Sequence, residues 1–243
     1  MSAAVLDGWK AGTFTGGGLT RPVYRRGSGP GVVVIHEVPG ITPKVTAFAQ
    51  DVVDAGFTVV MPSLVGEPGR EVSAGYSLAS VARICIASEF TTWATGSTSS
   101  VTGFLRELAA CSDAGVGAIG MCFSGGFALG MMIDGHVAAP VLSQPSLPFA
   151  VGRQRSADLN LSPGDLAVVK ERAAAGCEVL GLRFDQDRLV GRRFDSLQRE
   201  LGDAFIAVEY PSSKKTDHSV VTEQRVEDGV KRVLSFFREK LLV

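Results

Sequence analysis

Short apolar segments alternate with helical ones along most of this chain. Residues 32–35 are three valines and an isoleucine, and later apolar runs occupy residues 57–61, 116–119, 137–142, 177–184 and 205–208. Between them the apolar residues recur at helical spacing, and the last such segment, residues 222–242, is amphipathic. Strands without polar alternation are buried on both faces. The pattern therefore predicts an α/β fold, with helices on both faces of a mostly parallel central sheet.

Length and composition favour one domain over residues 1–243. Hydrophobic residues make up 45% of the 243 residues and charged residues 20%, which suits a large core and excludes a disordered chain. Residues 143–162 contain Pro145 and Pro148 and show no clear period, so we expect either a lid or an irregular surface excursion there. The formal net charge of −1 argues against nucleic acid or an anionic membrane as a partner.

The cysteines and the amino terminus favour a cytoplasmic protein. Cys85, Cys111, Cys122 and Cys177 form no CxxC pair, and the first ten residues contain neither a basic nor an apolar targeting segment. Residues 114–133 carry no charge and resemble a membrane span in composition, but six glycines interrupt them. A buried strand, a tight turn and a buried helix fit this stretch better.

One candidate nucleophile stands out at the end of that strand. In Gly120-Met121-Cys122-Phe123-Ser124-Gly125-Gly126, small residues on both sides of Cys122 allow a sharp turn between strand and helix. Such a turn exposes the thiol at a helix N-terminus, where a thiolate is favoured, and directs the Phe123 N–H toward a developing oxyanion. The alternative interpretation is a buried structural cysteine in a glycine-rich turn.

A cysteine nucleophile needs a base and an acid later in the chain. Of the three histidines, only His218 follows Cys122 in the order nucleophile, acid, histidine; His36 and His136 do not fit. Asp185 and Asp187 both follow the fifth strand and are both candidate acids. Glu37 and Val38 end an early strand, at the edge where such sheets bind ligands, and the Val38 N–H is a candidate second oxyanion donor. Each of these polar residues could instead be an ordinary loop residue.

Together these motifs resemble the dienelactone hydrolase family of α/β-hydrolases, from about residue 32 to the C-terminus. The resemblance implies an α/β-hydrolase fold, with Cys122 as nucleophile, His218 as base and Asp187 as acid. It also implies that Glu37 helps to deprotonate the thiol and that the amides of Val38 and Phe123 bind the oxyanion. The chain departs from the family pattern at Ser124, where glycine is common.

A second departure concerns substrate binding. The family's dienelactone enzymes bind a substrate carboxylate with arginines, one of them shortly after the histidine, whereas here the first arginine after His218 is Arg225. Arg70 and Arg83, together with Arg153 and Arg155, are either substitutes that bind an anionic group or ordinary surface residues.

These observations predict a hydrolase that cleaves an ester or lactone of a small molecule through a Cys-His-Asp triad and an acyl-enzyme. The alternatives are a thioesterase or acyltransferase, a non-hydrolytic isomerase or cyclase, and a catalytically silent binding protein on the same scaffold. No cofactor and no metal are expected, because three scattered histidines leave no ligand set. The expected state is a monomer or a homodimer.

Overall fold

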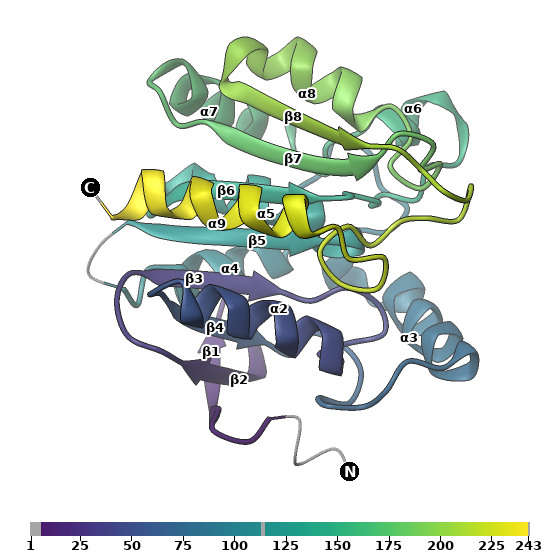
Figure 1. Cartoon of the computed structure of the whole chain (residues 1–243). Helices are drawn as coiled ribbons and strands as arrows, with labels where there is room; N and C mark the ends of the chain where they lie inside the picture. The colour runs from purple at the N-terminus through teal and green to yellow at the C-terminus, as the bar shows by residue number, and fades with distance from the viewer. Residues whose placement is uncertain (1–5, 113–114, 243) are drawn as a thin grey trace.

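The computed structural model describes residues 6–112 and 115–242 and contains one eight-stranded sheet (Figure 1). The strand order is β1-β2-β4-β3-β5-β6-β7-β8, with β1, β2 and β4 paired antiparallel and the strands from β4 to β8 paired parallel. The predicted mostly parallel sheet is therefore confirmed. The strands are β1 Lys10–Gly16, β2 Leu19–Arg26, β3 Gly31–Ile35, β4 Thr58–Pro62, β5 Val116–Met121, β6 Val137–Ser143, β7 Val179–Phe184 and β8 Phe205–Tyr210.

Helices cover both faces of this sheet (Figure 1). One face carries α2 (Pro43–Asp54) and α9 (Glu227–Leu241), and the other carries α4 (Val101–Ala109), α5 (Gly125–Met131), α7 (Pro163–Ala174) and α8 (Arg193–Leu201). The remaining helices, α3 (Ala74–Ile86) and α6 (Gly152–Ala157), lie at the end toward which the parallel strands point. Short 3₁₀ turns are η1 Ser88–Phe90, η2 Cys122–Ser124, η3 Met132–Asp134 and η4 Gly202–Ala204.

Burial on both faces explains the apolar strands. In β3, Val33 and Ile35 pack into the core on the α4 and α5 side, whereas Val32 and Val34 pack against α2 and α9. Successive side chains of a strand point to opposite faces, so each face needs its own apolar residues. Burying that surface is the main favourable contribution to folding.

The uncharged stretch around Cys122 is a strand, a turn and a buried helix, as the sequence indicates; residue 114 lies outside the described residues. Every residue of β5 and of α5 is buried within the protein. Among the described residues, no helix has the length and apolar character needed to cross a membrane.

Two segment predictions need correction. The last helix begins at Glu227 rather than at residue 222, because the preceding residues close a turn in which Val226 N–H donates to the Val220 carbonyl at 2.8 Å. Residues 143–162 are not wholly irregular, since β6 extends to Ser143 and α6 occupies Gly152–Ala157. A six-residue helix is too short to reveal its period in the sequence.

Candidate active site

Cys122 stands on a strained turn at the carboxyl end of β5. Its φ angle is 55°, a left-handed conformation that costs a non-glycine residue energy. The turn also needs close backbone approaches on either side. A Cβ at Gly120 would lie 2.1 Å from the Ser124 carbonyl oxygen, and one at Gly125 would lie 2.6 Å from Pro145 Cα. The glycines that predict a sharp turn are therefore required by its packing.

Ser124 ties this turn to the neighbouring strand. Its Oγ accepts a hydrogen bond from Met121 N–H at 2.8 Å and lies 3.0 Å and 3.1 Å from the carbonyl oxygens of Ile35 and His36. Those carbonyls are at the end of β3, which pairs with β5. The serine that departs from the family pattern is completely buried and supports the turn.

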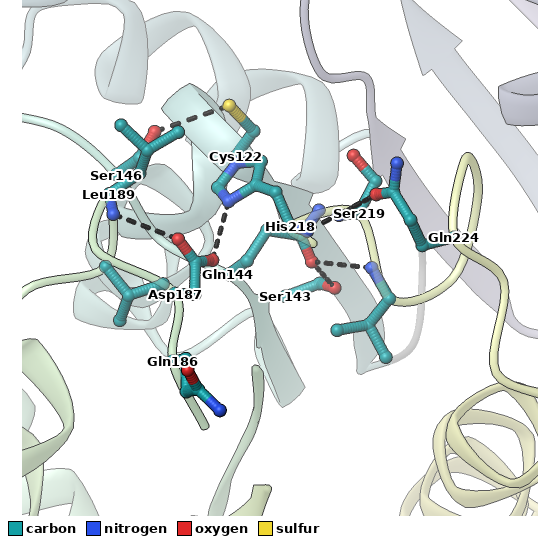
Figure 2. A network of polar contacts seen from close by, with 12 residues as sticks. Cys122, Ser143, Gln144, Ser146, Gln186, Asp187, Leu189, His218, Ser219 and Gln224 are labelled. Carbon is teal, nitrogen blue, oxygen red and sulfur yellow. Dashed lines mark hydrogen bonds and ion pairs between the residues drawn. The ribbon is translucent and has the colours of Figure 1, made fainter. Parts of the chain in front are cut away.

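His218 and Asp187 form a close pair beside Cys122 (Figure 2). His218 Nδ1 lies 2.6 Å from Asp187 Oδ2, and the other carboxylate oxygen accepts the Leu189 N–H at 2.9 Å. The remaining ring nitrogen, Nε2, is buried without a hydrogen-bond partner in the described part of the chain. Asp185 is exposed and accepts from Ser212 N–H instead. Of the two candidate aspartates, the structure thus brings Asp187 to the histidine.

The charge environment favours a protonated imidazole. Burial acts to lower the pKa of His218. The negative charge of a Cys122 thiolate and the hydrogen bond to Asp187 outweigh that effect and raise the pKa well above 6.5. The imidazole of His218 therefore favours its cationic form, with a proton on each ring nitrogen.

The Cys122 thiol contacts a residue that the sequence did not single out. Its Sγ lies 3.3 Å from Ser146 Oγ (Figure 2). The Ser146 N–H also donates to the Cys122 carbonyl at 3.0 Å. Ser146 follows β6 in the segment without period, so no local sequence signal identifies it.

Glu37 is buried near the histidine loop and is not hydrogen-bonded to the thiol in the described structure. Its carboxylate accepts from Ser219 Oγ at 2.6 Å, from Thr222 Oγ1, and from Gln144 Nε2 at 3.3 Å. Burial raises the pKa of Glu37 above its ordinary value, although the bonds from Ser219 and Thr222 act in the opposite direction. Through these hydrogen bonds, Glu37 connects the end of β3 to the loop after His218.

The candidate oxyanion donors flank the turn. Phe123 directly follows Cys122 in η2, and Val38 follows the end of β3, where Ile35 is in register with Gly120 of β5. Val38 and Cys122 pack against the same apolar cluster. Two peptide N–H groups on adjacent loops at a strand end are the usual source of an oxyanion hole in such sheets.

The arginines that are candidates for binding a charged ligand have other partners or are exposed in the described structure. Arg70 pairs with Glu67 at 2.9 Å, and its guanidinium stacks 4.4 Å from the centre of the Tyr76 ring. Arg83 is exposed on α3, and Arg155 contacts the Trp93 carbonyl at 3.1 Å. Within the described residues, no group of three or more His, Cys, Asp or Glu could hold a metal ion.

Comparison with known proteins identifies the family of this chain. The sequence pattern of the dienelactone hydrolase family matches residues 17–156, more than half of the chain and including the Cys122 turn. The chain belongs to the dienelactone hydrolase family. It is accordingly a carboxylic ester hydrolase. No curated protein sequence matches the chain.

Solved structures share the fold at low identity. A dienelactone hydrolase from Anabaena variabilis is 14% identical with a TM-score of 0.63, and the match covers 96% of this chain and 98% of that one. A dienelactone hydrolase-like promiscuous phosphotriesterase from metagenomic libraries is 17% identical, with a TM-score of 0.62 and the same coverage. A cold-adapted esterase from an Arctic intertidal metagenomic library is 14% identical, with a TM-score of 0.57 over 96% and 93%. These likenesses establish the α/β-hydrolase fold.

Proposed function

We propose that the protein hydrolyses an ester or lactone bond of a small molecule through a covalent acyl-enzyme on Cys122. The observation that carries this proposal is the left-handed turn that presents Cys122 beside a His218–Asp187 pair, which has a buried carboxylate and a 2.6 Å hydrogen bond. A histidine held by a buried acid, with its second nitrogen unpaired, is suited to proton transfer at the adjacent thiol.

The reaction proceeds in two acyl-transfer steps. The Cys122 thiolate attacks the carbonyl carbon, and the N–H groups of Val38 and Phe123 stabilise the oxyanion. As the C–O bond breaks, His218 Nε2–H protonates the leaving alcohol oxygen, or the ring oxygen of a lactone. Water then attacks the thioester and gives its proton to Nε2, and the thiolate leaves as the acid is released. Asp187 keeps the imidazole oriented and stabilises its cationic form.

The test is to trap the acyl-enzyme. The protein is mixed with activated aryl esters of short acids and with small lactones, quenched in acid, and digested for mass spectrometry. We expect the acyl mass on Cys122, and Cys122→Ala should lose the adduct and at least about a thousandfold in turnover.

Cys111→Ala is the matched control, because this thiol at the end of α4 is exposed and its one hydrogen bond among the described residues goes to the Glu107 carbonyl of the same helix. It should keep the adduct and full turnover. Undiminished turnover in Cys122→Ala would overturn the nucleophile, and hydrolysis with the acyl group on another residue would relocate it.

A further inference from the structure

Ser146 is buried against the reactive sulfur. The residue is 3% exposed, and Cys122 Sγ, at 3.3 Å, is the hydrogen-bond partner of its hydroxyl (Figure 2). The 3.0 Å bond from Ser146 N–H to the Cys122 carbonyl fixes the two backbones relative to each other. The segment after β6 is therefore attached to the nucleophile at two points, one of them at the sulfur.

We propose that Ser146 is a further catalytic residue, whose hydroxyl donates a hydrogen bond to the Cys122 thiolate. The inference rests on the proposed function, because it assigns Ser146 a role only if Cys122 is the nucleophile. The thiolate is then stabilised by the Ser146 hydroxyl and by the positive charge of the His218 imidazolium.

The direction of the hydrogen bond follows from the charges around the sulfur. Asp187 accepts from Nδ1 of His218, and in the imidazolium form, which the raised pKa of His218 favours, Nε2 carries a proton as well. The proposed function requires Cys122 to react as a thiolate, whose sulfur has no proton to donate. The Ser146 hydroxyl must then be the donor, and bonds to charged groups are stronger than neutral ones.

This hydrogen bond changes in strength through the reaction. A thioester sulfur is neutral and accepts weakly, so the bond is lost as the acyl-enzyme forms. It forms again when water attacks the thioester and the sulfur leaves as a thiolate. Ser146 therefore assists formation of the thiolate and its departure in deacylation, in the manner of an oxyanion donor placed at the leaving atom.

The experiment measures the alkylation rate of Cys122 by iodoacetamide against pH, with the labelled residue identified by mass spectrometry. In Ser146→Ala we expect the midpoint of the profile to move to higher pH and the rate below that midpoint to fall about tenfold. Acyl-Cys122 should also persist longer after mixing with an activated ester. Ser146→Thr, which keeps the hydroxyl, should restore both.

Ser196→Ala is the matched control, because Ser196 is also buried and its Oγ has no hydrogen-bond partner among the described residues. It should leave the profile unchanged. A Ser146→Ala alkylation profile equal to that of the parent overturns the proposal for Ser146. The proposal also fails if alkylation of the parent protein has its midpoint at the ordinary thiol value of about pH 8.5, a measurement that does not depend on the variant being folded. Neither result affects the trapping of an acyl group on Cys122. The proposal for Ser146 can therefore fail while the proposed function stands.

Discussion

At the scale of single residues, two aspartates only two positions apart have different surroundings. The Asp187 carboxylate is buried and bonds the imidazole of His218, whereas Asp185 is exposed and bonds the backbone of Ser212. Hydrogen bonds from the Ser212 backbone and side chain lower the pKa of Asp185. Asp185 therefore shapes the loop after β7, and Asp187 orients the candidate base.

Replacing each aspartate by asparagine separates these roles. Asp187→Asn should lower turnover by about a hundredfold to ten-thousandfold, because an amide favours the wrong imidazole tautomer and cannot stabilise the cation. Asp185→Asn is the control and should stay within a fewfold of the parent. The measurement is kcat on the ester that acylates Cys122, with circular dichroism to verify folding. The opposite ranking would exclude Asp187 as the acid.

At the scale of elements, one buried cation joins the loops that carry the site. Arg193, at the start of α8, is 1% exposed, and no ion pair involves it in the described part of the chain. Burial lowers its pKa to about 10, so the guanidinium is still charged at neutral pH. Its N–H groups donate to backbone carbonyls of Leu147, Pro148, Arg155, Leu189 and Val190. Leu147 and Pro148 follow Ser146 in one loop, Leu189 and Val190 follow Asp187 in another, and Arg155 lies in α6.

Arg193→Met should therefore weaken both the fold and the site. Several buried carbonyls would lose their donors, which we expect to cost on the order of 3 kcal/mol in the free energy of unfolding. Turnover at a temperature where the variant remains folded should also fall, because the acid loop is less well held. The control is Arg192→Met, since this neighbour is half-exposed and makes one 3.6 Å ion pair with Asp195. Urea unfolding measures the stability of both variants. Equal losses of stability at the two positions would contradict the role of Arg193 in holding these loops.

At the scale of the whole molecule, buried His36 makes stability depend on pH. Its Nε2 accepts from Leu64 N–H at 3.0 Å and its Nδ1 lies 2.8 Å from the Glu37 carbonyl, so the ring joins the ends of β3 and β4 as a neutral group. Burial lowers its pKa from 6.5 to about 4. Between these values the unfolded chain binds a proton that the folded protein does not, and stability decreases as pH falls.

Between pH 6.5 and pH 4, His36 should lower the free energy of unfolding by roughly 3 kcal/mol. The raised pKa of Glu37 acts in the opposite sense, because the folded protein then holds a proton that the unfolded chain releases as pH rises. The measurement is therefore the difference between the parent and His36→Gln in urea unfolding at several pH values. That difference should shrink with acidification, whereas His136→Gln, at an exposed position, should leave the pH dependence unchanged. A constant difference would contradict the linkage.

The fold and the turn at Cys122 could be predicted because their causes are local. Periodicity predicts the order of strands and helices, and the glycines at 120 and 125 lie within one turn of the cysteine they accommodate. The start of α9 could not be predicted in this way. The segment from Thr222 is amphipathic, but Thr222 bonds Glu37, a residue 185 positions earlier.

By itself the sequence determined the α/β alternation, the strained turn and the order in which the candidate nucleophile, acid and histidine follow one another. Only the tertiary structure decided which side chains meet. Ser146 approaches Cys122 across 24 positions, Asp187 meets His218 across 31, and Arg193 reaches the Leu147 carbonyl across 46. The physical reason is that backbone sterics and apolar periodicity act over a few residues. Contacts between loops depend instead on the strand order and on the burial that the assembled sheet imposes.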